Sequence, residues 1–253
     1  MALKGSVFFI LIAFYRRVYI MDPPVLQHDF QIIFALMPAF LPFEISENQF
    51  LVTSQRSLFW ENEKALILSD LHLGKAGHFR KSGIGIPQTV MLEDMQRLIA
   101  EIQLYQPASV IVIGDLFHSK ANKENDFFLK WRNDLPWLNI LLVKGNHDIL
   151  LDEWYREAGI QVVHQAYESG DFIFVHDIQD MATASGKYAF SGHIHPGIRI
   201  TGQGKQSLQF PCFYFGKKYA VLPAFGKFTG THPIHPKKGD AVFALVENSV
   251  IKM

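Results

Sequence analysis

Short apolar runs alternate with polar turns from about Glu44 to the C-terminus. The first half of this region predicts strands over residues 65–69, 109–113 and 140–143, and helices over residues 87–103, 125–131 and 151–158. The helix over 87–103 has the clearest pattern, because apolar side chains recur on one face behind Pro87. In the second half the helical pattern fades, and strands are predicted over 172–175, 188–190, 199–201, 219–222 and 241–246.

This order of elements, β-α-β-α-β followed by mostly β, is typical of the α/β class. Each sheet has to bury at least one apolar face, and two packed mixed β-sheets flanked by helices satisfy that requirement. The chain shows no internal repeat and no low-complexity tract. We therefore expect one domain over residues 45–253.

Polar clusters that contain metal-ligand residue types follow five of the predicted strands. These clusters are Asp70-Leu-His72, Gly114-Asp115-Leu-Phe-His118, Gly145-Asn146-His147-Asp148, the single His176, and Gly192-His193-Ile-His195. Sites in α/β sheets form beyond the carboxyl ends of the strands, where loops hold polar groups on a rigid support. Five clusters from distant parts of the chain are therefore expected to converge in one cleft.

Each cluster also has an ordinary structural explanation. Asp70 could cap a helix, Gly114-Asp115 could form a turn, and His176 alone could be a hydrogen-bonded histidine. The pair His193 and His195 is more informative, since alternate residues of an extended chain share a face and can bind one ion. It is the conjunction of all five clusters, each after a β run, that favours a metal site.

The series DLH, GDLFH, GNHD, H and GHIH resembles the calcineurin-like metallophosphoesterase superfamily over Asp70 to His195. The resemblance implies a four-layer α-β-β-α sandwich and a metal-dependent hydrolase of phosphoric esters. More narrowly, DLHLGKAGHFRKSGIGIP, PCFYFG and LPAFGKFTGTHP resemble the bacterial ligase-associated DNA damage response endonucleases, from about Asn48 to the C-terminus. That similarity implies a phosphodiesterase or endonuclease acting on DNA in repair, with a DNA ligase and a helicase as partners.

The superfamily resemblance also implies the ligands of two metal ions. One ion would take Asp70, His72 and His195 and share Asp115, and the other would take Asp115, Asn146, His176 and His193. Nitrogen and oxygen ligands without thiolate suit Mn²⁺, Fe or Zn²⁺, with Mn²⁺ our first expectation, and several imidazoles disfavour Mg²⁺. Two such ions held close together activate water and clamp a phosphoryl group.

Other residues are expected to act on the substrate. By resemblance, His147 would stabilise the transition state or protonate the leaving oxygen, with Asp148 as its orienting partner. Lys75, His78 and Arg80 follow the first cluster and could bind the substrate backbone, although a solvated basic loop explains them equally well. For His118, support of the ligands and an ordinary loop position both stay open.

One position departs from the superfamily pattern. Many members have glycine after the histidine that corresponds to His176, whereas this chain has Asp177. Glycine often allows a backbone to pass close to a ligand. The substitution leaves the imidazole available, so we expect an altered loop geometry rather than a lost ligand.

Composition and charge narrow the function further. Lys plus Arg and Asp plus Glu number 24 each, so the chain lacks the basic excess that would indicate bulk affinity for nucleic acid. Cys212 is the only cysteine, which excludes an internal disulfide and fits the cytoplasm. A nucleotide or sugar-nucleotide pyrophosphohydrolase is the main alternative, but that group typically has arginine where this chain has His147. A non-enzymatic scaffold is disfavoured because every ligand position holds a competent residue.

Residues 1–44 are expected to lie outside this domain. Their apolar run over residues 6–14 is interrupted by Arg16 and Arg17, well short of the ~20 residues that a membrane span requires. A membrane-surface helix, a docking segment and an extension from an early start codon are the three interpretations. We favour the third, with Met21 and Met37 as internal starts.

Overall fold

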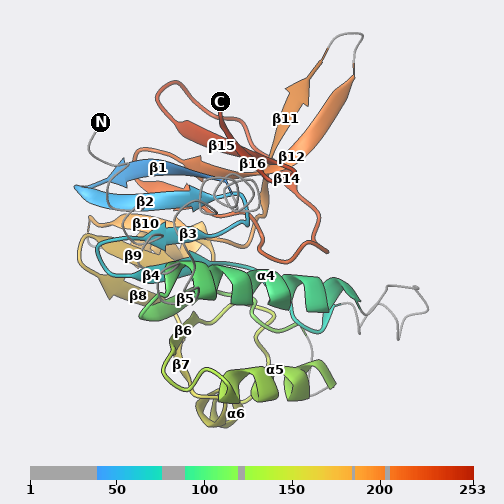
Figure 1. The fold of residues 1–253 in the computed structure, drawn as a ribbon. Coiled ribbons are helices and arrows are strands. Elements are labelled where there is room, and N and C mark those ends of the chain that lie inside the picture. The colour runs from blue at the N-terminus through green and yellow to red at the C-terminus, as the bar shows by residue number, and fades with distance from the viewer. Residues whose placement is uncertain (1–38, 76–88, 119–122, 184–185, 203–205) are drawn as a thin grey trace, which may run out of the picture. The chain divides into compact units, whose positions relative to one another are not determined.

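The computed structural model describes residues 39–75, 89–118, 123–183, 186–202 and 206–253. Two mixed β-sheets carry the fold of this part of the chain (Figure 1). The strands of the first sheet, in spatial order, are β1 (Phe40–Ile45), β2 (Asn48–Thr53), β3 (Leu58–Trp60), β4 (Ala65–Leu68), β5 (Ser109–Ile113), β6 (Asn139–Val143) and β7 (Ile160–Val163). Strands β1 to β4 pair antiparallel, and β4 to β7 pair parallel.

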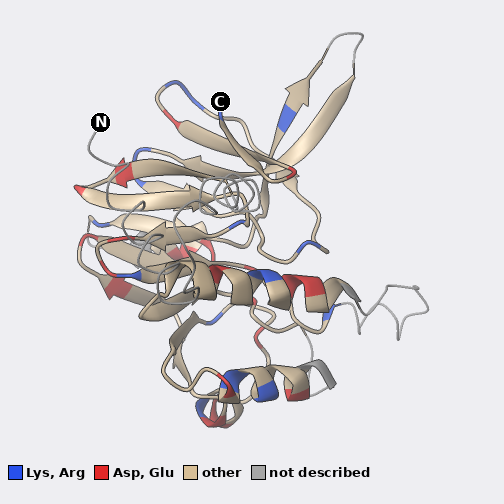
Figure 2. Cartoon of the chain, viewed as in Figure 1, with Lys and Arg blue, Asp and Glu red and all other residues tan. Residues whose placement is uncertain are grey.

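Helices join the parallel strands of the first sheet. They are α4 (Thr89–Tyr105), α5 (Lys123–Asn133) and α6 (Asp152–Glu157). A parallel connection has to cross over the sheet, so these helices cover one of its faces. None of the helices within the described ranges is long and apolar enough to cross a membrane. Figure 2 shows both acidic and basic residues on α4 and α5, with Lys130 and Arg132 in the last turn of α5.

The second sheet is built from the later part of the chain. Its strands are β8 (Ala166–Ser169), β9 (Phe172–Val175), β10 (Tyr188–Ser191), β11 (Pro196–Thr201), β12 (Ser207–Phe215), β13 (Tyr219–Val221), β14 (His232–Pro233), β15 (Ala241–Val246) and β16 (Ser249–Lys252). Strands β9, β10 and β13 pair parallel in its centre, and the short 3₁₀ helix η1 (Ile178–Thr183) connects β9 to β10. The β11–β12 hairpin projects away from the other strands (Figure 1).

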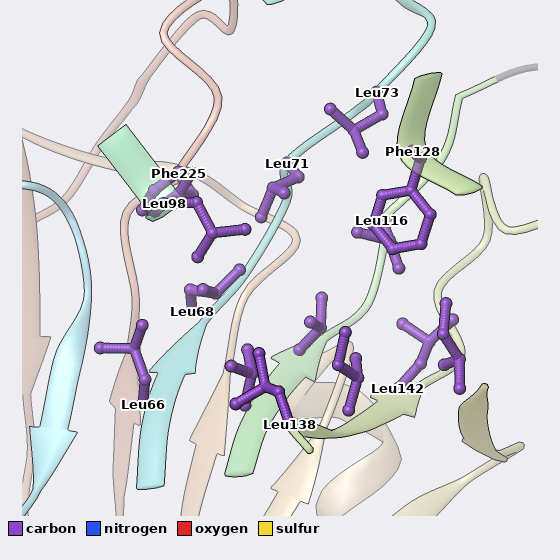
Figure 3. Close-up of a cluster of buried hydrophobic side chains, with 14 of the residues drawn as sticks. Leu66, Leu68, Leu71, Leu73, Leu98, Leu116, Phe128, Leu138, Leu142 and Phe225 are labelled. Atoms are coloured by element: carbon purple, nitrogen blue, oxygen red, sulfur yellow. The ribbon is translucent and has the colours of Figure 1, made fainter. Parts of the chain in front are cut away.

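Side-chain alternation along the strands divides the core into layers. On β4, Leu66 and Leu68 face the helices, whereas Ala65 and Ile67 face the second sheet. Figure 3 shows Leu66 and Leu68 in the helix-side cluster, together with Leu98 of α4. Because these side chains are fully buried, a Leu66→Ala change should cost ~2–5 kcal/mol of stability.

The structure confirms the α/β sandwich and most of the predicted elements. Strands β5, β9 and β15 have the predicted bounds, and β4, β6, β10 and β13 fall within one residue of them, whereas β11 begins three residues before the predicted strand over 199–201. Helices α4, α5 and α6 lie where the sequence predicts them, with differences of two residues at the ends of α4 and α5 and of one residue at the ends of α6. The outer face of the second sheet is covered, as far as the described residues show, by η1.

The predicted domain boundary needs one adjustment. Strand β1 begins at Phe40 and pairs with β2 along its whole length, so the residues from Phe40 to Glu44 belong to the first sheet. Sequence reasoning placed them in the N-terminal segment because their apolar run continues that of the segment before them. Residues 1–38 lie outside the described ranges, and the three interpretations of the N-terminal segment stay predictions.

Candidate metal centre

The predicted ligands lie where strands of both sheets end. Asp70 follows β4, Asp115 follows β5 and Asn146 follows β6, while His176 and His193 follow β9 and β10 of the second sheet. The first two loops stay paired beyond their strands, because Asp70 N donates to Gly114 O at 3.1 Å and His72 N donates to Asp115 O at 2.8 Å. The loop positions are therefore fixed by main-chain hydrogen bonds before any ligand binds.

Five of these ligands have a backbone conformation that L-residues rarely adopt. Their φ angles are 52° for Asp70, 51° for His72, 51° for Asp115, 66° for His193 and 48° for His195. A left-handed conformation costs a non-glycine residue roughly 1–2 kcal/mol, and such residues concentrate at functional sites. The fold therefore sustains local strain at both the Asp-x-His and His-x-His pairs.

Two glycines leave room for the ligand side chains. A β-carbon at Gly114 would lie 1.9 Å from Nδ1 of His176, and one at Gly192 would lie 2.5 Å from Oδ2 of Asp70. In each case the glycine of one sheet's loop faces a predicted ligand from the other sheet. Any larger residue at either position would displace that ligand.

The first cluster consists of Asp70, His72 and His195. Nε2 of His195 lies 3.4 Å from Oδ1 of Asp70 and 3.3 Å from Nε2 of His72. Oδ1 of Asp70 is buried without a hydrogen-bond partner, while Oδ2 accepts a hydrogen bond from His193 N at 3.1 Å. An unpartnered buried carboxylate oxygen facing two imidazoles indicates a position for a cation.

Electrostatics keep this cluster ready to bind a cation. Burial lowers the pKa of His72 to about 2, so its imidazole is neutral and holds a free lone pair. Burial by itself raises the pKa of Asp70, but the neighbouring imidazoles, His195 before His176 and His72, lower it below its ordinary value. A neutral imidazole and an ionised carboxylate are the forms that bind metal.

The second cluster consists of Asp115, Asn146, His176 and His193. Nε2 of His176 lies 3.0 Å from Oδ1 of Asn146, 3.1 Å from Nδ1 of His193 and 3.5 Å from Oδ1 of Asp115. Nδ1 of His176 lies 3.2 Å from the carbonyl oxygen of Ile113, to which only a protonated Nδ1 can donate. In the neutral ring Nε2 then carries a lone pair, which faces the oxygens of Asn146 and Asp115. A cation between these atoms would stabilise this arrangement.

Asp115 joins the two clusters through its two oxygens. Oδ1 lies 3.5 Å from Nε2 of His176, and Oδ2 lies 3.9 Å from Nε2 of His72. Oδ1 also accepts a hydrogen bond from His147 N at 2.9 Å. Burial raises the pKa of Asp115, with opposing contributions from His176 and His147. This geometry suits a carboxylate that bridges two ions.

The donor spacings test whether metal ions fit. Two nitrogen or oxygen ligands that are each about 2.1 Å from one ion lie about 3.0–3.4 Å apart. The distances of 3.0–3.5 Å within each cluster agree with this value. Asp70, His72 and His195 form one candidate metal group, and Asp115, His176 and His193 form the other. Both groups therefore fit a divalent ion.

Comparison with known proteins identifies the family. A family model described as Calcineurin-like phosphoesterase matches residues 64–207, which is more than half of the chain. The chain belongs to the calcineurin-like phosphoesterase family. It is therefore a metal-dependent phosphoester hydrolase, and the family's use of divalent metals agrees with the two clusters.

A solved structure supports the fold of this phosphoesterase. The chain is similar to the Pseudomonas putida nuclease MPE, with a TM-score of 0.72 and 24% sequence identity over 85% of this chain and 100% of that chain. At this identity the similarity establishes the fold. A comparison with curated proteins finds no match.

His147 lies beside the first cluster of the phosphoesterase site. Its ring centroid is 5.4 Å from that of His72 and 4.3 Å from that of His118. Its imidazole is half-buried, so it can reach both the centre and the solvent. His118, whose role the sequence left open, is therefore a ring neighbour of His147.

Asp148 makes contacts that the sequence did not predict. Its Oδ1 accepts hydrogen bonds from Phe117 N at 3.0 Å and Tyr155 OH at 3.4 Å, and its Oδ2 accepts one from Gly145 N at 2.9 Å. Both oxygens therefore bind the loops after β5 and β6, and not the imidazole of His147. Asp148 therefore braces these two loops, and its role as the orienting partner of His147 stays a prediction.

One of the three predicted substrate-binding residues can be located. Lys75 is half-buried beside the first cluster, where burial lowers its pKa and the charges of Asp115 and Asp70 raise it. Its ammonium group therefore lies within the electrostatic field of the metal-binding carboxylates. His78 and Arg80 lie outside the described residues, and their roles stay predictions.

A supporting loop was missed by sequence reasoning. Phe225 N donates to Ser69 O at 2.8 Å and Gly226 N donates to Asp70 O at 3.1 Å, so residues 224–226 hold the first ligand loop in place. Arg97 of α4 in turn donates to Phe225 O and stacks 4.1 Å from its ring. The only signal in the sequence was the subfamily-like stretch LPAFGKFTGTHP, which carries no chemistry of its own.

Proposed function

We propose that this phosphoesterase is a phosphodiesterase or endonuclease that acts on DNA in repair. The observation that carries the proposal is the pair of donor clusters joined by Asp115, whose oxygens lie 3.5 Å from His176 and 3.9 Å from His72. Asp70, His72 and His195 would hold one ion and Asn146, His176 and His193 would hold the other, with Asp115 shared. Mn²⁺ is the proposed metal, with Fe and Zn²⁺ as alternatives.

The chain's own residues act around the metal ions. Bound divalent ions supply Lewis acidity toward a phosphoryl group. Lys75 binds a non-bridging phosphate oxygen through its ammonium group, which faces the same centre. The imidazole of His147 gives a proton to the leaving oxygen. The hydrogen bond from His147 N to Asp115 holds the main chain from which this imidazole extends.

The polymeric substrate is supported by similarity. The structural neighbour is named as a nuclease, and the motifs DLHLGKAGHFRKSGIGIP and LPAFGKFTGTHP resemble the ligase-associated endonucleases. The balanced charge of the chain indicates no bulk affinity for nucleic acid, so a local basic patch or the metal centre itself has to supply the attraction. A DNA ligase and a helicase are the proposed partners, and the cytoplasm is the proposed location.

A substrate panel tests this function. Metal-free protein is reconstituted with Mn²⁺, Fe²⁺ or Zn²⁺ and assayed on bis-p-nitrophenyl phosphate, single-stranded DNA, nucleotides and sugar-nucleotides. We expect hydrolysis of the diester and cleavage of DNA, with the highest rates in Mn²⁺. Rapid nucleotide or sugar-nucleotide hydrolysis without DNA cleavage would contradict the nuclease proposal and favour a pyrophosphohydrolase.

A further inference from the structure

Asp177 lies behind one of the proposed metal ligands. Its Oδ2 is 3.8 Å from Nε2 of His193, and the two side chains are 26% and 37% exposed. Asp177 comes directly after His176, at the end of β9, and Gly192 N donates to His176 O at 3.1 Å. The two loops therefore run side by side, with the Asp177 carboxylate facing the outer edge of the His193 ring.

The two nitrogens of His193 face different surroundings. Nδ1 lies 3.1 Å from Nε2 of His176, inside the second cluster, whereas Nε2 faces Asp177. A neutral imidazole that binds a cation through Nδ1 carries its proton on Nε2. The N–H group would then point toward the Asp177 carboxylate, in the manner of the carboxylate–histidine–metal arrangements that orient ligands.

The carboxylate of Asp177 is held by its own loop. Oδ1 accepts a hydrogen bond from Gln179 N at 3.0 Å, and Asp180 N donates to the main-chain oxygen of Asp177 at 3.0 Å. These contacts form the turn that starts η1. One carboxylate oxygen fixes the residue to its turn, which leaves the other oxygen directed at His193.

We propose that Asp177 is a positioning residue that keeps the His193 proton on Nε2 and turns Nδ1 toward the second metal ion. The inference rests on the proposed function, because it takes His193 to be a ligand. It gives a role to the residue that replaces the glycine found in many superfamily members. Carboxylate partners of this kind typically change metal affinity by 10–100-fold. Since this pair is partly exposed and 3.8 Å apart, we expect the lower end of that range.

Asp177→Ser separates the two functions of the carboxylate. A serine hydroxyl can still accept from Gln179 N and start η1, but it is too short to reach His193. The matched control is Asp171→Ser, which makes the same chemical change on an exposed residue at the other end of β9. Thermal unfolding of both variants checks that the fold is kept, and Asp177→Asn, which also keeps a capping oxygen, replaces Asp177→Ser if that variant is destabilised.

Two measurements test the inference without using catalytic activity. Titration of the metal-free proteins with Mn²⁺ should show the weaker site binding about tenfold less tightly in Asp177→Ser, with the control within twofold of the wild type. Long-range ¹H–¹⁵N NMR of the metal-free protein should show His193 protonated at Nε2 in the wild type and in the control. In Asp177→Ser the Nδ1-protonated form should increase, which a change in the η1 turn alone would not cause.

The outcomes separate this inference from the function on which it rests. If Asp177→Ser binds both ions with wild-type affinity and keeps the wild-type tautomer, Asp177 does not position His193. His193→Ala is titrated in parallel. If His193→Ala also keeps both ions at full affinity, the assignment of His193 as a ligand fails, and the proposed centre with it.

Discussion

The two donor clusters differ in how far they are withdrawn from solvent. In the first cluster Asp70 is completely buried and His72 is 6% exposed. In the second cluster Asp115 and His176 are buried, but Asn146 is exposed and the His193 side chain is 37% exposed. A buried cluster loses less side-chain entropy and less hydration when it binds an ion. We therefore infer that the first cluster holds its ion more tightly than the second.

Removing the shared carboxylate tests the link between the clusters and has the largest expected effect. Asp115→Asn keeps the hydrogen bond from His147 N but removes the negative charge that faces both clusters. Loss of Lewis-acid stabilisation worth several kcal/mol should lower kcat by at least about 10³-fold. Steady-state kinetics on bis-p-nitrophenyl phosphate, together with metal analysis, measure this. Unchanged turnover with full metal content would refute the bridging role.

Replacing the proposed acid should leave both clusters intact. His147→Gln keeps the main-chain hydrogen bond to Asp115 but cannot donate a proton, so kcat should fall by about 10²–10⁴-fold. The metal content should stay at the wild-type value, which distinguishes this variant from the ligand variants. A substrate with a good leaving group, such as p-nitrophenolate, should recover part of the loss. If it recovers none, His147 does not act as the acid.

Metal addition should stabilise the protein through both clusters unequally. A site contributes about 2.7 kcal/mol to the free energy of unfolding when free Mn²⁺ is 100 times that site's own dissociation constant. At one Mn²⁺ concentration the tighter site therefore contributes more. Asp70→Asn should remove the larger share of the thermal shift and His193→Ala the smaller share. Calorimetry in EDTA and in Mn²⁺ measures both. If Mn²⁺ raises the unfolding temperature of Asp70→Asn and His193→Ala equally, the two clusters do not differ in affinity as we infer.

The smallest expected effect concerns backbone strain in the ligand loops. His193 has a φ of 66°, a conformation that glycine adopts without penalty and alanine does not. Metal-free His193→Gly should therefore be more stable than His193→Ala by about 1 kcal/mol. Chemical denaturation in EDTA gives this difference. A more stable alanine variant would mean that the loop relaxes to an ordinary conformation once the imidazole is removed.

The convergence of the proposed ligands could be predicted because parallel strands end at one edge of a sheet. The strand runs before Asp70, Asp115 and Asn146 are apolar on both faces, so their ends were visible in the sequence. The partners of Asp148 could not be predicted, since they depend on how the loops after β5 and β6 fold against each other.

Two other features had no sequence signal for a different reason. The left-handed conformation of His195 and its neighbours arises from tertiary constraint, which overrides local preference. Strands β1 to β3 were missed because their short runs do not alternate cleanly. Phe50 and Val52, for example, face the inter-sheet core while Leu51 faces the helices, so β2 is apolar on both sides.

The contact between Gly114 and His176 has a consequence for how the domain opens. Gly114 directly follows β5 of one sheet, and His176 directly follows β9 of the other, with no room for even a methyl group between them. Nδ1 of His176 also lies within hydrogen-bonding distance of the Ile113 carbonyl. The two sheets are therefore in direct contact at the edge where the proposed ligands lie. Amide hydrogens of β5 and β9 should therefore exchange with solvent as one cooperative unit, protected until the whole domain unfolds.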